Sequence, residues 1–233
     1  MSSGYTRPNS PMASQFLSRA LGPYRGARNP VTHSGRGFRA KFASKKNQRM
    51  VRCESLLELD FVRSAEFARN VIRYEEQPVT IDYRLDGRPR RYTPDFLLTW
   101  RDGTRWYVEV KPSELLAMEK NQEKFLAITE FFRDRGQRFI TIDEKQIRHP
   151  VRLPQIKELL RLRSPSALNL ITDLEEIVLP ADATFGSIAA DMGEDVASSA
   201  LTYRLVVFDL TARLNAATPI SVYEENDDVA LLI

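Results

Sequence analysis

Residues 92–111 read Tyr92-Thr-Pro-Asp95-Phe-Leu-Leu-Thr-Trp-Arg-Asp-Gly103-Thr-Arg-Trp-Tyr-Val-Glu109-Val-Lys111. Two runs in this stretch, 96–100 and 106–110, are rich in aromatic and β-branched residues, as is typical of strands. Gly103 is the last residue of the short segment between them, where a three-residue hairpin loop with a bulge needs a left-handed residue. The sequence therefore predicts a β-hairpin with residue 102 at its tip.

The length of this loop sets which residues of the hairpin face each other. With residue 102 at the tip, Asp95 lies opposite Glu109, and the facing Cβ atoms of such a pair are about 4.5–5.5 Å apart. Because strand side chains alternate, Lys111 shares the face of Glu109 while Val110 points the other way, into apolar packing. A loop one residue shorter would shift the register and separate the two carboxylates.

Two carboxylates and an ammonium group on one face indicate a catalytic site. Carboxylate oxygens suit Mg²⁺, which binds through one or two of them and keeps several waters for a phosphate substrate. A lysine beside such a site can hold the attacking water or neutralise charge that develops on the phosphate. The alternative is a surface hairpin in which Lys111 forms an ordinary ion pair with Asp95 or Glu109. The register, the proline before Asp95 and the apolar flanks favour the catalytic interpretation.

Four blocks of sequence carry a resemblance to a known family. They are Cys53-Glu-Ser-Leu-Leu-Glu58-Leu-Asp-Phe61, Tyr74-Glu-Glu-Gln77-Pro78-Val-Thr-Ile-Asp-Tyr83, Tyr92-Thr-Pro-Asp95-Phe96 and Val108-Glu109-Val-Lys111-Pro112. The chain resembles the PD-(D/E)xK nucleases and, over residues 45–145, looks like the N-terminal nuclease domain of TnsA, the endonuclease subunit of heteromeric cut-and-paste transposases. The specificity of the resemblance lies in the ordered set of blocks rather than in any one of them.

The resemblance implies a Mg²⁺-dependent DNA endonuclease, with Mn²⁺ able to substitute. Asp95 and Glu109 would bind the metal, with the carbonyl oxygen of Val110 as a further ligand by analogy. Lys111 would position the water that attacks the phosphate. Glu58 matches the acidic position in the first helix of the family and would complete the site or help to place a second ion.

A helix is predicted over residues 54–70, where apolar side chains recur every four residues and face a core. Two carboxylates, Glu54 and Glu58, lie one turn apart on it, and Glu58 is the preferred candidate for the site. The spacing Ser55-x-x-Glu58 is also that of a capping box, in which Glu58 would only satisfy backbone donors at the helix start. Both interpretations remain open at this point.

The order of the predicted elements is αβββαβ, the core of a restriction-endonuclease-like α/β (α+β) fold. After the first helix come strands over 71–76, 79–86 and 88–100, the last two joined by an Asp86-Gly87 turn. A helix over 113–135 with Ser113 as N-cap ends at Gly136 and leads to a strand over 138–142. The run Arg88, Arg90 and Arg91 is interpreted as a solvated edge rather than a phosphate contact.

Composition indicates a packed globular protein that stays in the cytoplasm. The chain has 233 residues, 42% of them hydrophobic, and no apolar run long enough to span a bilayer or to serve as a signal peptide. One cysteine and two histidines give little support to a zinc site or a Ser/His/Asp triad. The resemblance adds a prokaryotic, nucleoid-associated location.

Charge is distributed unevenly along the chain. Residues 1–50 carry ten Lys and Arg and no Asp or Glu, whereas residues 151–233 carry six basic and thirteen acidic residues. Residues 1–48 are predicted to be a basic, partly disordered arm that contacts the DNA backbone, or a solvated tail. The candidate DNA-binding residues are Arg36, Arg39, Lys41, Lys45 and Lys46. The acidic C-terminal part suits a protein partner better than a polyanion.

Three regions follow: the arm at 1–48, a nuclease domain at 49–148 and a small winged-helix-like interaction domain at 149–233. The last is predicted from helices over 153–162, 166–177, 185–192 and 196–214 and a terminal strand pair, 220–223 with 229–233. The resemblance implies that the enzyme cuts the 5′ ends of a transposon in double-stranded DNA. Its partners would be a DDE transposase (TnsB-like) and an AAA+ ATPase regulator (TnsC-like) bound by the C-terminal domain.

Two other functions are compatible with the sequence. One is a free-standing restriction or phage-type endonuclease of the same fold, which would cut DNA without partners. The other is a non-catalytic, DNA-bound assembly factor, although the set Glu58, Asp95, Glu109 and Lys111 argues against it, because a scaffold has no need of clustered like charges.

Overall fold

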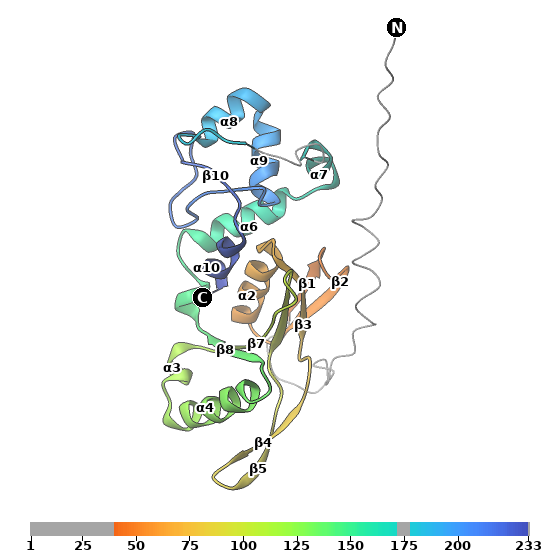
Figure 1. Cartoon of the computed structure of the whole chain (residues 1–233), viewed down its shortest axis with the longest axis vertical. Helices are drawn as coiled ribbons and strands as arrows, with labels where there is room; N and C mark the ends of the chain where they lie inside the picture. The colour runs from red at the N-terminus through yellow and green to blue at the C-terminus, as the bar shows by residue number, and fades with distance from the viewer. Residues whose placement is uncertain (1–39, 172–177, 233) are drawn as a thin grey trace.

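The computed structural model describes residues 40–171 and 178–232. Its centre is a four-stranded sheet in the order β3-β6-β7-β8 (Figure 1). The first three strands in this order are antiparallel, and the last runs parallel to its neighbour. The strands are β3 (Val71–Glu76), β6 (Phe96–Trp100), β7 (Arg105–Val110) and β8 (Arg138–Ile142).

A helix covers each face of this sheet. Side chains alternate along β6, so that Phe96 packs with Phe61 of helix α2 (Leu56–Phe67), at 5.2 Å between ring centroids. On the other face Tyr107 stacks on Phe132 of helix α4 (Glu119–Arg133), at 4.2 Å. The order α2, β3, β6, β7, α4, β8 confirms the predicted αβββαβ core.

The hairpin of β6 and β7 has the predicted register. Phe96 pairs with Val108 and Leu98 with Trp106, as a loop with residue 102 at its tip requires. The loop contains Gly103 at φ +86°, the left-handed conformation that glycine adopts without strain. The loop length therefore fixed the arrangement of the two strands as the sequence indicated.

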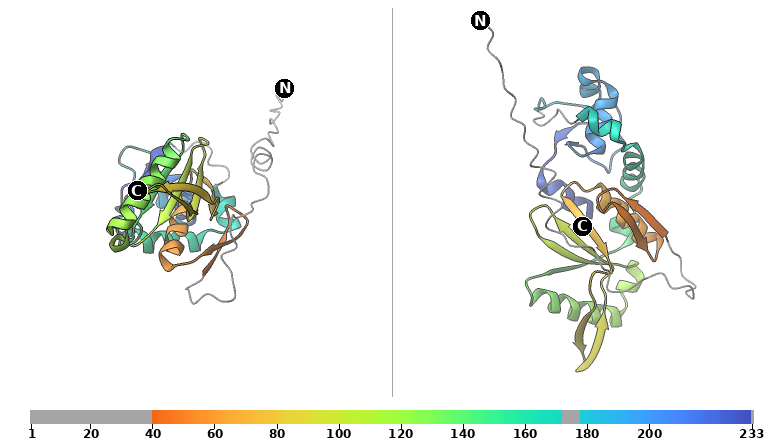
Figure 2. Two further views of the ribbon diagram at one scale, coloured as in Figure 1. Left: turned by 90° about the horizontal axis from the view of Figure 1, so that it is seen from below. Right: turned by 90° about the vertical axis from the view of Figure 1, so that its right-hand side faces the viewer.

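A second hairpin, β4 (Ile81–Leu85) and β5 (Arg88–Tyr92), is inserted between β3 and β6 and forms a sheet of its own. It projects away from the central sheet beyond α4 (Figures 1 and 2). Its two-residue turn has Asp86 at φ 52° and Gly87 at φ 73°, the pair of positive angles that a type I′ turn needs. The Asp-Gly turn was predicted, and the projection of the hairpin was not. The single strand predicted over 88–100 is instead two strands, β5 and β6, and neither β4 nor β5 belongs to the central sheet.

The helix predicted over 113–135 is interrupted. The structure has α3 (Ser113–Leu116) and α4, separated at Met118, whose extended backbone (φ −67°, ψ 128°) breaks the helix. Ser113 lies inside α3 rather than at its N-cap, because its backbone N–H and hydroxyl both donate to Glu144, at 2.7 and 2.5 Å. Glu144 begins the short helix α5 (Glu144–Ile147). Gly136, at φ +64°, lies just beyond α4 as expected.

Folded structure begins before residue 48, contrary to the predicted extent of the arm. Strands β1 (Ala40–Ser44) and β2 (Arg49–Cys53) form an antiparallel hairpin that packs on α2. The buried carboxylate of Glu66 holds the turn of this hairpin, accepting from Ser44 Oγ at 2.8 Å and from the backbone N–H of Lys45 at 3.1 Å. Because this segment is rich in basic residues, the sequence predicted a disordered arm rather than the strand β1.

The C-terminal part is mainly helical, with one small sheet. Its elements are α6 (Arg152–Leu162), α7 (Pro165–Ile171), α8 (Phe185–Met192), α9 (Glu194–Thr202), β9 (Val206–Val207), β10 (Ser221–Val222), the 3₁₀ helix η1 (Glu225–Asp228) and α10 (Val229–Leu232). The winged-helix assignment of this part stays a prediction. Residues 172–177, part of a predicted helix, lie outside the described residues.

Two predictions for this part were wrong. The helix predicted over 196–214 ends at Thr202, because Arg204 turns the backbone to φ +53° and the chain then enters β9. The segment 229–233 was predicted as a strand, but its described residues form the helix α10. Leu231 and Leu232 of α10 are buried in the core beside α2, and this packing outweighs the strand preference of an apolar tail.

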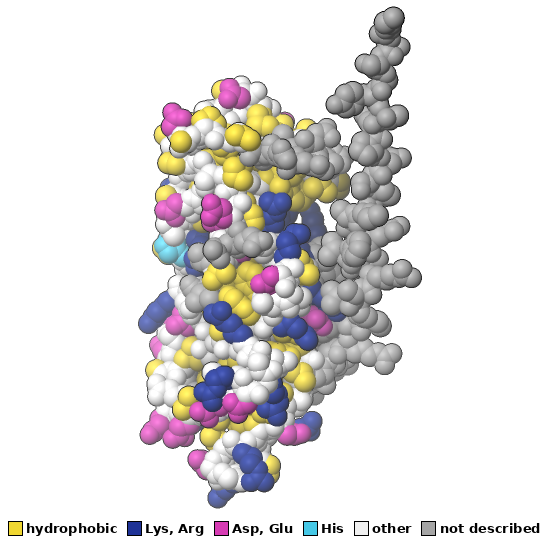
Figure 3. All heavy atoms as spheres, viewed as in Figure 1, with side chains coloured by type: hydrophobic (Ala, Val, Ile, Leu, Met, Phe, Trp, Pro, Cys, Tyr) yellow, Lys and Arg dark blue, Asp and Glu magenta, His cyan; other side chains and the backbone are white. Residues whose placement is uncertain are grey.

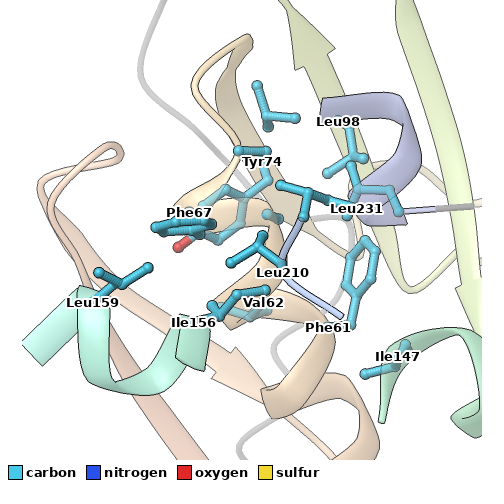
Figure 4. Close-up of a cluster of buried hydrophobic side chains, with 14 of the residues drawn as sticks. Phe61, Val62, Phe67, Tyr74, Leu98, Ile147, Ile156, Leu159, Leu210 and Leu231 are labelled. Carbon is cyan, nitrogen blue, oxygen red and sulfur yellow. The ribbon is translucent and has the colours of Figure 1, made fainter. Parts of the chain in front are cut away.

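One hydrophobic core runs across the predicted boundary at residues 148 and 149. Figure 4 shows three side chains of the C-terminal part near Phe61 and Val62 of α2. They are Ile156 of α6, Leu231 of α10 and Leu210 of the loop after β9. The C-terminal segment therefore helps to build the core behind the central sheet. Among the helices of the described residues, none has the length and apolar character needed to cross a membrane.

Candidate active site

The structure brings Asp95, Glu109 and Lys111 together. Asp95 directly precedes β6, and the register of the strand pair places it opposite Glu109 of β7. Asp95 Oδ2 accepts a hydrogen bond from the backbone N–H of Val110 at 2.9 Å. Lys111 Nζ donates to Glu109 Oε1 at 2.8 Å. The Val110 side chain packs with the α2 cluster on the opposite face, as predicted, so the three polar groups lie on the face that α4 covers.

Two residues of the site were missed by sequence reasoning. Tyr92, at the end of β5, donates its hydroxyl to Glu109 Oε2 at 2.5 Å, so both oxygens of this 4%-exposed carboxylate are held. Lys124 of α4 lies over the Tyr92 ring, with Nζ 4.7 Å from its centroid. Only the packing of α4 beside the β4–β5 hairpin brings both residues to the carboxylates.

The site concentrates negative charge in a poorly solvated place. Burial raises the pKa of the Asp95 carboxyl well above its usual range, and the charges of Glu109 and Glu58 raise it further. The Val110 N–H bond and the Lys111 ammonium act in the opposite direction. Like charges gathered at a partly buried position weaken a fold, and such clusters are characteristic of functional sites.

Glu58 supports the start of α2, as one of the two interpretations that the sequence left open predicts, and its role in the site stays a prediction. Its backbone N–H donates to the N-cap Ser55 Oγ at 3.0 Å, and its Oε2 accepts from the backbone N–H of Glu54 at 2.7 Å, one residue before the Ser55 N–H that a capping box would use. From the start of α2, the charge of Glu58 raises the pKa of Asp95. The pKa of Glu58 itself is raised mainly by burial, and the charges of Glu54 and Glu109 also raise it. Glu58 is therefore a helix cap at the border of the site.

Neighbouring polar residues fix the backbone around Asp95. Gln77, a buried residue in the left-handed region at φ 45°, donates its backbone N–H to the carbonyl oxygen of Asp95 at 2.8 Å. Its side-chain amide donates to Glu54 Oε1 at 3.1 Å. Glu76 accepts from both Arg49 nitrogens, at 2.7 and 2.5 Å, and ties β3 to β2. Glu54 and Glu76 are thus occupied in supporting contacts.

The five candidate DNA-binding residues have different surroundings. Arg36 and Arg39 lie outside the described residues, and Lys41 is exposed. Lys45 Nζ donates to the carbonyl oxygen of Arg163. Lys46 Nζ donates to three carbonyl oxygens, those of Ala65 at 2.9 Å, Val71 at 2.6 Å and Ala68.

These contacts engage the Lys46 ammonium at the C-terminal end of α2, so the structure favours a capping role over the predicted DNA contact. Burial and the nearby Arg163 lower the pKa of Lys46 to about 7. Its ammonium is directed toward the protein interior rather than toward solvent, where a phosphate would bind.

Replacing Lys46 with methionine should destabilise the protein by about 1–3 kcal/mol, because carbonyl oxygens at the end of α2 lose their donor. Urea unfolding of wild type and Lys46→Met measures this loss. A phosphate contact would instead weaken DNA binding and reduce its salt dependence, with little change in stability. A variant of wild-type stability and weakened DNA binding would contradict the capping role.

A divalent cation suits the donors of this site. Asp95 Oδ1 accepts no hydrogen bond from the described residues, and Glu109 faces it across the strand pair. Two carboxylates match the demand of Mg²⁺, which takes one or two protein carboxylates and completes its shell with water and phosphate oxygens. Within residues 40–171 and 178–232 no three acidic, histidine or cysteine side chains form a ready-made metal cluster. Asp95, Glu109 and the Val110 carbonyl are the groups that could hold the ion.

Comparison with known proteins agrees with this geometry. A family model described as "TnsA-like endonuclease N terminal" matches residues 68–144, about a third of the chain. A search of curated proteins gave no match to the chain. The matched residues run from the end of α2 to the start of α5 and include Asp95, Glu109 and Lys111, whereas Glu58 lies before them. The family indicates a nuclease that acts on DNA in transposition. Over residues 68–144 this chain is therefore similar to the N-terminal domain of TnsA-like endonucleases.

Proposed function

We propose that the protein is a Mg²⁺-dependent DNA endonuclease that serves as the TnsA-like subunit of a heteromeric transposase. The observation that carries this proposal is the pairing of Asp95 with Glu109 on one face of the β6–β7 hairpin, with Lys111 beside them. The family match over the same residues supports the nuclease chemistry and the link to transposition. Mn²⁺ is expected to substitute for Mg²⁺.

Asp95 and Glu109, with the Val110 carbonyl, would hold the metal in this proposal. A bound Mg²⁺ would polarise the scissile phosphate and favour the ionised form of a coordinated water. Lys111, held by Glu109 at 2.8 Å, is placed to orient the attacking water and to offset negative charge on the phosphate. Glu58 would contribute its charge from the border of the site and help to place a second ion.

Within a transposase the enzyme would cut the 5′ ends of the element, which are the ends of the non-transferred strands. A DDE transposase of the TnsB type would cut and join the 3′ ends. An AAA+ regulator of the TnsC type would bind the C-terminal part, where thirteen acidic residues against six basic ones over 151–233 suit a protein surface. The protein would then act on DNA in the nucleoid.

The proposal is tested on a duplex that carries a transposon end, with each strand labelled in turn. The purified protein is incubated with Mg²⁺, alone and together with the transposase and ATPase encoded beside its gene. Cleavage at the 5′ end that depends on both partners supports the proposal. Robust cutting by the protein alone would instead identify a free-standing nuclease, and no cutting in any mixture would favour the assembly factor.

Tyr92 is a positioning residue in this account, because its hydroxyl holds Glu109 Oε2 at 2.5 Å. Tyr92→Phe keeps the ring that packs on Phe125 and removes the hydroxyl. We expect cleavage to slow by about tenfold, which corresponds to one charge-assisted hydrogen bond. The Mg²⁺ concentration for half-maximal rate should rise, since Glu109 is less well oriented. A lower rate with unchanged Mg²⁺ dependence would contradict the positioning role.

A further inference from the structure

The β4–β5 hairpin is an exposed basic projection. In Figure 3 its end, at the bottom of the view, carries basic side chains on a lobe that stands clear of the rest of the protein. The basic residues of this hairpin are all exposed, namely Arg84, Arg88, Arg90 and Arg91. The hairpin also carries the acidic residues Asp82 and Asp86, which leaves it a net positive charge.

The register divides these arginines between two faces. Arg90 pairs with Tyr83 and Arg88 with Leu85, and directly paired residues share a face. Tyr83 and Tyr92 are buried in the cluster that packs on α4, so Arg90 and Arg88 continue the α4 face of the hairpin outward. Burial raises the pKa of Tyr83 while the charge of Arg90 lowers it, which agrees with their closeness.

The same face leads to the active site. Tyr92, two residues beyond Arg90 in β5, holds Glu109 by a hydrogen bond. Lys124 lies over the Tyr92 ring, and Lys111 lies next to Glu109. Arg88, Arg90, Lys124 and Lys111 therefore form a row of positive charge, here named the cationic row, that runs from the hairpin tip to the carboxylate pair.

The two outer members of the cationic row are free to bind a ligand. On the opposite face Arg91 lies 3.7 Å from Asp82, and Arg84 donates to the Gly87 carbonyl at 3.2 Å. Among the described residues, neither the Arg88 nor the Arg90 guanidinium has a hydrogen bond or an ion pair. Exposed guanidinium groups with all donors available match the geometry of phosphate oxygens.

We infer that the β4–β5 hairpin is a DNA-contacting element, with Arg88 and Arg90 binding backbone phosphates beside the scissile bond. This inference rests on the proposed DNA endonuclease function. At about 3.4 Å per strand residue, Arg88 lies about 14 Å from Tyr92 along β5. That distance spans about four base pairs at 3.4 Å each. A two-stranded β-ribbon is also narrow enough to enter the major groove.

The test compares wild type with the Arg88→Gln/Arg90→Gln double variant in binding a fluorescein-labelled duplex that carries the transposon end. Binding is followed by anisotropy in EDTA, so that cleavage plays no part. The buried base of the hairpin is unchanged in this variant. The matched control is Arg161→Gln/Arg213→Gln, which removes the same charge from exposed positions of the C-terminal part.

The logarithm of the binding constant is plotted against the logarithm of the salt concentration over about 50–200 mM. The slope of this plot should be less steep by roughly two units in the hairpin variant than in wild type, since each lost phosphate contact accounts for about 0.9. The control should keep the wild-type slope. Equal slopes in wild type and hairpin variant, or no binding by wild type at the lowest salt, would overturn the inference. If the hairpin variant has a less steep salt dependence than wild type but the wild type cleaves no DNA in any mixture, the hairpin contact would stand and the proposed nuclease function would be rejected.

Discussion

The Asp95→Asn variant should cleave DNA at least about a thousandfold more slowly than wild type, since a metal ligand supplies several kcal/mol of transition-state stabilisation. Asparagine preserves the size of the side chain and an oxygen that can accept the Val110 N–H bond. It removes the charge that would hold the cation in the proposed site. Single-turnover cleavage of a labelled duplex, with the partner subunits present, measures the effect.

The same substitution should stabilise the metal-free protein. Asp95 lies partly buried beside the carboxylates of Glu109 and Glu58, and removing one of the three like charges relieves their repulsion. A higher melting temperature together with lost cleavage would separate the catalytic effect from misfolding. Asp134→Asn, at an exposed carboxylate just beyond α4, is the control and should change neither property. Near-normal cleavage by Asp95→Asn would contradict its role as a metal ligand.

The Asp228→Ala variant should lose about 3–5 kcal/mol of stability, the cost of leaving a buried charge without its partner. Asp228 is fully buried, and its Oδ1 lies 2.9 Å from Nε of Arg204, whose side chain is 4% exposed. Its Oδ2 accepts from the Asn70 N–H at 2.5 Å and from the Tyr223 hydroxyl at 2.6 Å. Denaturant unfolding followed by circular dichroism measures the loss.

A paired apolar replacement controls for the charge. Arg204→Met/Asp228→Leu removes both charges and should recover much of the stability that Asp228→Ala loses, because no unpaired charge then remains buried. The contact with Asn70 joins η1 to the start of β3, so the C-terminal segment supports the nuclease core directly. A loss below about 1 kcal/mol in Asp228→Ala would show that this network does not hold the segment in place.

The sequence predicted those parts of the fold that depend on local rules. The three-residue loop ending at Gly103 set the register of β6 with β7, and that register alone brings Asp95 to Glu109. Alternation then placed Val110 on the apolar face. The strands at 71–76 and 138–142 agree with the structure for the same reason, since their apolar runs lie between clear turn residues.

The sequence could not predict features that arise from contacts between distant segments. Tyr92 reaches Glu109 because the β4–β5 hairpin folds against α4. Lys46 has the charge that binds a phosphate, but its ammonium donates to backbone carbonyl oxygens at the end of α2. Arg204 ends a helix that its local sequence would continue, because its guanidinium pairs with Asp228. In each case tertiary packing overrides the local pattern.

The proposed cleavage would depend on partner proteins, so cation binding by the carboxylate pair tests the central claim most directly. Mn²⁺, detected by electron paramagnetic resonance, is titrated into wild type, Asp95→Asn and Glu109→Gln. The paired carboxylates predict a bound Mn²⁺ in wild type that Mg²⁺ displaces and that both variants lose. Mn²⁺ binding that is absent from wild type, or unchanged in both variants, would contradict a metal site between Asp95 and Glu109.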